Sequence, residues 1–215
     1  MKIAIPSYNR VDTLHAKTYA LLIKEGIPIE WITIFVADEE EKGKYQEIFS
    51  NVSVVVGIKG ISGIRNFITN YYEEGEMYLS IDDDISKFVY PPGSSLLIEI
   101  QKMEDRLASS EAHLLGVNPT GNPFFMRGEF KEGLYFCVGC FFMTRNRKEI
   151  IVDSQLDDYE RTMENFLRDK KVIRYDQFSF KTKYYADGGL SGERNLETYT
   201  NAVNDLYERY YLGRY

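Results

Sequence analysis

Four short apolar runs, each followed by a polar loop or a helical pattern, organise the first 85 residues of the chain. They are rich in β-branched residues and have the length of buried strands. The runs lie at residues 2–5, 31–37, 52–56 and 78–81. Strands and helices that alternate over such short distances indicate a mostly parallel sheet with helices on both faces. The first half therefore predicts an α/β, Rossmann-like fold.

The intervening helices of this half are expected at three places. Asp12 or Thr13 can cap the first helix, which Gly26 ends. A charged amphipathic helix follows at residues 39–49, and another at residues 64–72 after a glycine-punctuated loop.

The second half is less regular, and we expect it to form a mixed, acceptor-side part of the same domain. The expected elements are a helix at 94–109, a strand at 114–117, a loop at 119–133, a strand at 134–144, a helix at 159–167, a strand-rich stretch at 172–185, a loop at 186–192 and a helix at 195–211. We predict one domain over residues 1–215, with a nucleotide-binding half at 1–90 and an acceptor-side half at 91–215. The sequence is also compatible with one domain of a longer protein.

Charge, hydropathy and cysteine content argue against several classes of protein. The net charge is −7 with no basic run, which argues against a nucleic-acid partner. No stretch reaches the roughly 18 apolar residues of a spanning helix. Cys137 and Cys140 form a Cys-x-x-Cys motif, but on a strand they would face opposite sides, and no second Cys/His pair exists. We expect structural cysteines in a reducing compartment, and hence a cytoplasmic protein.

Three consecutive acids, Asp82, Asp83 and Asp84, end the fourth apolar run. Adjacent carboxylates repel one another, and a divalent cation relieves this repulsion. In an extended chain Asp82 and Asp84 would point one way and Asp83 the other. Two hard oxygen ligands on one side suit Mg²⁺ or Mn²⁺ better than Zn²⁺. The alternative is an acidic turn that only solvates the strand end.

The other strand ends add a polar loop, a lone carboxylate and a glycine loop. They carry Pro6, Ser7, Tyr8, Asn9 and Arg10 after the first strand, Asp38 after the second, and residues 60–65 after the third. Ligands of open α/β sheets bind beyond the carboxyl ends of the strands. Together with the acids, these loops favour a nucleotide with a diphosphate.

The ordered set of residues resembles the GT-A glycosyltransferases. Residues 3–10 are similar to the opening strand and loop of that family, and Asp38, Arg65-Asn66 and Asp82 to Asp84 follow in its order over about 85 residues. The resemblance implies a GT-A fold, a UDP-sugar donor with Mn²⁺ or Mg²⁺, and a glycan or glycoprotein acceptor. In finer detail the chain is similar to glycosyltransferase domains of chlorovirus enzymes that build capsid-protein glycans, which implies a host cytoplasm.

The same resemblance implies a role for each residue of the donor site. Tyr8 would lie against the uracil, Asp38 would accept from its imide N–H, and Arg65 would hold the base or the diphosphate. Asp82 would touch the ribose or a metal-bound water, and Asp84 would bind the metal. The remaining donor-binding residues would be Pro6, Ser7, Arg10, Gly63 and Asp83.

Each role has a structural alternative. Tyr8 would then only pack, Asp38 would cap the next helix, and Arg65 would be a solvated helix charge. Many family members add a histidine to the metal. This chain has only His15 and His113, neither of them well placed.

Asp157 and Asp158, before the helix expected at 159–167, are the candidates for a general base. In an inverting enzyme a carboxylate takes the proton of the acceptor hydroxyl. In a retaining enzyme neither residue need do so, and helix capping is the structural alternative. Arg65 would stabilise the leaving diphosphate electrostatically. A sugar-stacking face could come from Phe124, Phe125, Phe141 and Phe142, although core packing is the simpler interpretation.

Three other functions compete with this one. The spacing Asp82-x-Asp84-x-Ser86 is similar to the nucleophile motif of haloacid-dehalogenase-type phosphatases, but that motif normally follows the first strand. A nucleotidyltransferase that makes nucleotide-sugars usually has a glycine-rich basic loop after its first strand, which residues 6–10 lack. A non-catalytic module that binds a sugar or a nucleotide is the third alternative.

Overall fold

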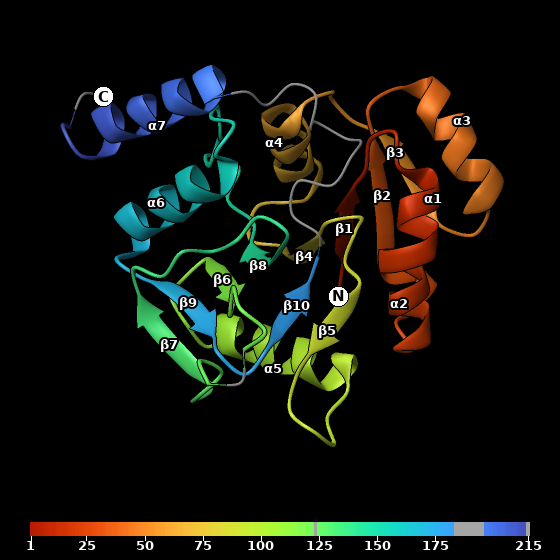
Figure 1. The fold of residues 1–215 in the computed structure, drawn as a ribbon, viewed down its shortest axis with the longest axis horizontal. Helices are drawn as coiled ribbons and strands as arrows, with labels where there is room; N and C mark the ends of the chain where they lie inside the picture. The colour runs from red at the N-terminus through yellow and green to blue at the C-terminus, as the bar shows by residue number, and fades with distance from the viewer. Residues whose placement is uncertain (123, 183–195, 214–215) are drawn as a thin grey trace.

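An eight-stranded sheet runs through the computed structural model, which describes residues 1–122, 124–182 and 196–213 (Figure 1). In spatial order its strands are β3 (Ser53–Val56), β2 (Ile32–Val36), β1 (Ile3–Pro6), β4 (Met77–Ile81), β8 (Phe141–Arg145), β6 (Leu114–Val117), β9 (Val172–Tyr175) and β7 (Phe130–Gly133). A separate antiparallel ribbon pairs β5 (Lys87–Val89) with β10 (Ser179–Lys181). The loop expected at 186–192 lies outside the described residues.

The sheet is mostly parallel, as the alternation of strands and helices predicts. β1 pairs in parallel with β2 and β4, β2 with β3, and β6 with β9. β8 is antiparallel to both β4 and β6, and β7 is antiparallel to β9. The antiparallel pairs all involve strands of the second half, which is therefore mixed as expected.

Helices cover both faces of the sheet. They are α1 (Val11–Leu14), the π-helical η1 (His15–Tyr19), α2 (Ala20–Lys24), the 3₁₀ turn η2 (Ile29–Trp31), α3 (Glu39–Ile48), α4 (Ile61–Tyr71), α5 (Leu96–Ala108), α6 (Asp157–Asp169) and α7 (Leu196–Tyr210). In Figure 1, α4 and α6 lie above the sheet and α5 lies below it. No helix of the described residues has both the length and the hydropathy to cross a membrane.

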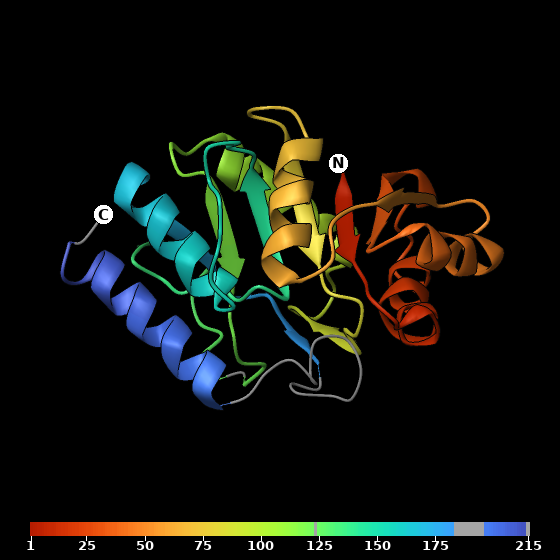
Figure 2. The ribbon, with the colours of Figure 1, turned by 90° about the horizontal axis from the view of Figure 1, so that it is seen from above.

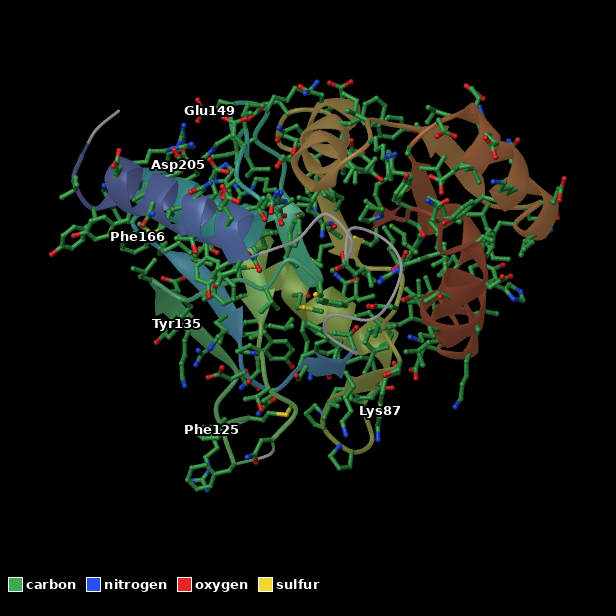
Figure 3. All side chains as sticks on the ribbon, turned by 45° about the horizontal axis from the view of Figure 1, so that its top comes forward. Lys87, Phe125, Tyr135, Glu149, Phe166 and Asp205 are labelled. Atoms are coloured by element: carbon green, nitrogen blue, oxygen red, sulfur yellow. The ribbon has the colours of Figure 1, made fainter. Side chains whose placement is uncertain are left out.

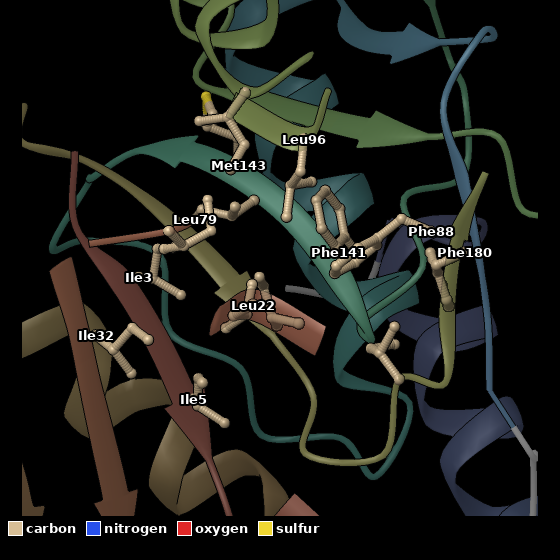
Figure 4. Close-up of a cluster of buried hydrophobic side chains, with 14 of the residues drawn as sticks. Ile3, Ile5, Leu22, Ile32, Leu79, Phe88, Leu96, Phe141, Met143 and Phe180 are labelled. Atoms are coloured by element: carbon tan, nitrogen blue, oxygen red, sulfur yellow. The ribbon is translucent and has the colours of Figure 1, made fainter. Parts of the chain in front are cut away.

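The alternation of strand side chains divides the core into two clusters. Ile3, Ile5 and Leu79 pack with residues of α2 and α5, such as Leu22 and Leu96, in the larger cluster (Figure 4). The intervening Ala4 and Tyr78 pack with Ile64 and Ile68 of α4 on the other face. This two-residue period is the pattern of strands buried on both faces.

Two helix starts differ from those expected. Arg10 occupies the N-cap position of α1, where no side chain caps the helix, and Asp12 lies inside the first turn, so the predicted cap by Asp12 or Thr13 is wrong. Helix α4 begins at Ile61, earlier than expected, because Gly60 at its N-cap adopts a φ of +97° that only glycine tolerates readily.

The long strand expected at 134–144 is the clearest error of the sequence analysis. Strand β8 begins only at Phe141, and β7, within the expected loop, ends at Gly133. The cysteines lie in the connection between them, so the argument from opposite faces of a strand does not apply. Both are free thiols, and Cys137 is buried against Gly116, where an added Cβ would lie 2.8 Å from its Sγ.

The phenylalanines considered for sugar stacking separate into two pairs. Phe141 and Phe142 are buried in the two core clusters. Phe124 and Phe125 are exposed, and Figure 3 shows Phe125 on a loop at the edge of the molecule.

Candidate active site

The loop after β1 and the turn after β4 meet because these two strands are neighbours in the sheet. Ser7 donates a 2.6 Å hydrogen bond to Asp83, and Nη1 of Arg10 lies 3.3 Å from a carboxylate oxygen of both Asp83 and Asp84. Burial raises the pKa of Asp83 to about 6, and the Ser7 hydroxyl and Arg10 oppose this rise. Asp83 therefore joins the two loops from inside the protein. Pro6 ends β1, paired with Phe35.

The three acids do not follow the predicted alternation of directions. Asp83 and Asp84 lie in a turn, not in extended chain, and both approach Arg10. The hydroxyl of Thr18 fixes this turn, since it donates to the carbonyl of Asp82 at 2.8 Å and accepts from the amide of Ile85 at 2.9 Å. Thr18 lies in the π-helical turn η1, a conformation that is frequent at functional sites.

Arg65 connects the acidic turn to the second half of the protein. Its side chain is only 2% exposed, so the alternative of a solvated helix charge is wrong. It donates to Ser80 at 2.8 Å, to Asp82 at 2.8 Å and to the carbonyl of Gly139 at 2.9 Å. Burial alone would lower the pKa of Arg65, but the carboxylates of Asp82 and Asp157 raise it overall. The guanidinium is a permanent buried cation.

Asp157 lies between two arginines. One of its carboxylate oxygens, Oδ2, is 3.4 Å from Nε of Arg65 and 3.7 Å from Nη2 of Arg161, and has no hydrogen-bond partner. The Arg161 guanidinium in turn lies 4.6 Å from the ring centre of Phe142. Asp157 is thus a buried anion held by charge, not a helix cap, since Leu156 occupies the N-cap position of α6.

Asp158 has a different environment on the same turn. It is partly exposed and accepts from the amides of Tyr159 at 2.9 Å and Gly139 at 3.4 Å. Burial, and then the charge of Asp157, raise the pKa of Asp158 to about 6. A carboxylate with this pKa can accept a proton near neutral pH.

The acidic turn fits a divalent cation only in part. Thr182 donates to Oδ1 of Asp84 at 2.5 Å, and Asp82 is bound by Arg65. Among the residues that the structure describes, no group of three or more His, Cys, Asp or Glu side chains could hold a metal. His15 packs against Tyr19, and His113 pairs with Asp169. An ion at Asp82 and Asp84 would need phosphate oxygens and water to complete its shell, as Mg²⁺ usually does.

The loops after β1 and β2 are joined by one residue that the sequence did not single out. Buried Glu41 accepts from the amides of Asn9 at 2.5 Å and Ala37 at 3.1 Å, and so ties the ends of β1 and β2 together. Asp38 is the N-cap of α3 and accepts from the amide of Glu41 at 2.9 Å, as the capping alternative predicts. The Lys59 ammonium lies 5.0 Å from the ring centre of Tyr8.

The two glycines of the site have different reasons to be glycine. A Cβ on Gly63 would lie 2.8 Å from Cγ2 of Ile58, so Gly63 allows the loop before α4 to fold back on itself. A Cβ on Gly139 would lie 3.3 Å from the Cβ of Asp158. Gly139, which we did not predict, therefore lets the loop approach both Arg65 and Asp158.

Comparisons with known proteins support the fold and leave the family open. No family model matches the chain, and no curated protein matches it. A solved mycobacterial protein superposes with a TM-score of 0.59 at 11% identity, covering 97% of this chain and 74% of the other. Glucosyl-3-phosphoglycerate synthase from Mycobacterium tuberculosis, solved with phosphoglyceric acid, also has a TM-score of 0.59, at 12% identity, covering 97% and 79%. Together with the mixed sheet and its flanking helices, this likeness shows that the chain has the GT-A glycosyltransferase fold.

Proposed function

We propose that the chain is a glycosyltransferase that moves a sugar from a nucleotide-sugar donor to a hydroxyl of an acceptor. The observation that carries the proposal is the position of Arg65. This buried cation bonds Asp82 on the donor turn at 2.8 Å and lies 3.4 Å from Asp157, the neighbour of Asp158. It thus lies between the place where a diphosphate would leave and the place where a base is available.

The donor in this proposal is a UDP-sugar bound at the carboxyl ends of β1 to β4. Tyr8 would offer its ring to the uracil. The Asp38 oxygen that does not cap α3 would accept from the imide N–H. Arg10 and Arg65 would attract the diphosphate, which carries the opposite charge.

Asp82 and Asp84 would hold a Mn²⁺ or Mg²⁺ ion together with phosphate oxygens of the donor. When bound, such an ion supplies Lewis-acid stabilisation of the leaving diphosphate. Arg10 already neutralises part of the charge of Asp84, at 3.3 Å, and would share this carboxylate with the ion.

Asp158 is the proposed general base, in preference to Asp157. In an inverting transfer, the acceptor oxygen bonds to the anomeric carbon while the bond from that carbon to the phosphate oxygen breaks. The proton of the hydroxyl passes to Asp158, and the nucleoside diphosphate leaves. Asp157 is fixed between two guanidinium groups, whereas Asp158 is partly exposed with a pKa of about 6.

Nucleotidyl transfer and simple binding are the alternatives to this proposal. The loop of residues 6–10 is closed by Ser7, Arg10 and the buried acids, and is not a glycine-rich phosphate cradle. The motif of the phosphatase alternative would follow β1, whereas Asp82 follows β4.

Release of the free nucleoside diphosphate tests the proposal directly. The purified chain is incubated with UDP-, GDP- and ADP-sugars, with and without Mn²⁺, and hydrolysis of each donor is measured. We expect metal-dependent UDP release from a UDP-sugar, since many transferases slowly use water as acceptor. A protein that binds UDP but releases none is a binding module. Release of pyrophosphate from a nucleoside triphosphate and a sugar phosphate identifies a nucleotidyltransferase.

A viral role belongs to the same proposal and rests on the sequence resemblance. The acceptor would be a glycan of a capsid glycoprotein, modified in the host cytoplasm. The two free cysteines fit a reducing compartment. Transfer to a capsid glycopeptide whose terminal sugar has been removed, with no transfer to the intact one, would support it.

A further inference from the structure

A groove between α6 and α7 is lined mostly by tyrosine side chains. Its volume is about 250 Å³, and it is lined by Tyr159, Met163, Leu206, Tyr207, Tyr210 and Tyr211. The two helices lie alongside each other in Figures 1 and 2. The donor-site residues described above do not line it.

Polar contacts hold α7 against α6 and keep the groove formed. Arg209 of α7 pairs with the buried Glu160, whose other carboxylate oxygen accepts from the amides of Asp153 and Ser154 at 2.7 and 2.8 Å. The Tyr210 hydroxyl donates to Glu164 at 2.5 Å. These contacts of Arg209 and Tyr210 hold α7 against α6, while the rings of Tyr207 and Tyr211 stay exposed.

The rings of Tyr207 and Tyr211 stack on each other at the groove. They stack with centroids 4.8 Å apart and an angle of 19° between their planes, although the side chains are 50% and 75% exposed. On the α6 side the Tyr159 ring stacks on Phe136, with centroids 4.2 Å apart. Aromatic faces with hydroxyl groups at their edges suit a ligand that has one apolar face and a polar rim.

We propose that this groove binds saccharide units of the acceptor glycan, beyond the unit that receives the transferred sugar. A pyranose ring has a face of C–H groups and a rim of hydroxyls, the chemistry that the lining offers. The proposal rests on the proposed function, because it gives that transfer a carbohydrate acceptor.

The position of the groove relative to Asp158 favours this occupant. Tyr159 directly follows Asp158, and Met163 lies one turn further along α6. With a rise of about 1.5 Å per residue, the groove begins within one helical turn of the proposed base and leads away from it. An acceptor chain whose reactive hydroxyl reaches Asp158 would therefore extend its neighbouring units along α6 into the groove.

Binding to an array of defined neutral and acidic oligosaccharides tests the groove without any transfer. The wild type is compared with Tyr207→Ala, Tyr211→Ala and Tyr199→Ala. Tyr199 is the matched control, because it is 51% exposed on the same helix and does not line the groove. We expect binding to at least one class of glycan, weakened about tenfold by each groove variant and unchanged in the control. Absence of binding to every glycan, or equal binding by all variants, overturns the proposal.

Two further measurements separate failure of the groove from failure of the proposed function. UDP-sugar hydrolysis to water needs no acceptor, so Tyr207→Ala should hydrolyse the donor at the wild-type rate while the KM for a bound glycan rises about tenfold. If the wild type does not hydrolyse the donor, the proposed transferase function is rejected. The glycan array then tests the groove independently. Sedimentation decides against a glycan if the wild type dimerises and Tyr207→Ala does not, because a second copy then occupies the groove.

Discussion

Two pairs of adjacent aspartates, Asp83-Asp84 after β4 and Asp157-Asp158 at the start of α6, are connected through Arg65, which contacts Asp82 of the β4 turn and Asp157. In each pair one carboxyl has a pKa raised to about 6 by burial, Asp83 in the first and Asp158 in the second. Their surroundings differ. Asp83 is buried, with its oxygens bound by Ser7 and Arg10. Asp158 is partly exposed and, among the residues that the structure describes, accepts from the backbone amides of Gly139 and Tyr159.

This difference shows that a raised pKa alone does not identify a general base. Desolvation raises the pKa of any buried carboxyl, including one whose oxygens are already used for structure. Asp83 joins two loops, and each of its carboxylate oxygens already contacts a side chain, Ser7 at one oxygen and Arg10 at the other. Asp158 has both the pKa and the access. In the proposed mechanism, this difference favours a structural and donor-binding role for the acids after β4, and proton transfer for the second acid of α6.

The largest effect is expected at Asp84. Asp84→Ala and Asp84→Asn should both abolish Mn²⁺-dependent UDP binding and all transfer, because each removes a proposed anionic metal ligand. Asp84→Asn keeps the oxygen that accepts from Thr182, so its melting temperature should stay close to that of the wild type. The measurement is the melting shift produced by Mn²⁺ with UDP. A melting shift in Asp84→Asn as large as that of the wild type would show that the metal does not bind at the acidic turn.

Asp158→Asn should lower transfer by about 10²–10⁴-fold and leave UDP binding unchanged, since it removes only the acceptor of the proton. In the wild type, kcat/KM should fall as the pH drops below about 6, where Asp158 becomes protonated. This acidic limb should be absent from the variant.

The raised pKa also means that Asp158 stabilises the fold most below about pH 4, and that this contribution is lost as the pH rises through about 6. Asp158→Asn should thus gain stability relative to the wild type on going from pH 4 to pH 7.

Asp157→Asn should act mainly on stability. It leaves two buried guanidinium groups, Arg65 and Arg161, without the carboxylate between them. Breaking a buried ion pair typically costs about 3–5 kcal/mol, which urea denaturation would measure. Transfer by the folded fraction should remain within about tenfold of the wild type, well short of the loss of a base. If Asp157→Asn has the stability of the wild type and loses as much transfer as Asp158→Asn, the roles of the two acids are the reverse of those proposed.

The sequence predicted the positions of these acids because each follows a clear pattern. β-branched runs marked the ends of β1 to β4, and loops at the same edge of a parallel sheet had to converge. Arg65 could be singled out because it lies near the start of the helix expected after the glycine loop, in the order of residues that resembles the GT-A family. What could not be predicted was which acid each arginine would bind, because Asp83 and Asp84 form a turn and the extended-chain argument fails there.

The missed residues share a dependence on contacts distant in sequence. Glu41 is one acid among the three that begin α3. Only its hydrogen bond from the amide of Asn9, in the loop after β1, shows that it joins two strand ends. Gly139 lies in an apolar stretch that has the composition of a strand, but the stretch is buried as a loop under Arg65. Neither contact leaves a periodic signal, so composition and spacing could not reveal it.

The smallest effect is expected at Thr18, which holds the β4 turn. Thr162 holds the start of α6 in the same way, since its hydroxyl donates to the carbonyl of Asp158 at 2.7 Å and accepts from the amide of Cys137 at 3.1 Å. Thr18→Val removes the hydroxyl that donates to the carbonyl of Asp82 and accepts from the amide of Ile85. Leaving these buried groups unpaired should cost about 1–3 kcal/mol in the free energy of unfolding. Thr18→Ser keeps the hydroxyl and should retain most of the stability. Because the turn carries Asp82 and Asp84, the KM for the donor should rise in Thr18→Val while the pH limb assigned to Asp158 stays at about pH 6. A limb that moves with Thr18→Val would mean that the two acidic pairs titrate as one unit, and the division of roles between them would fail.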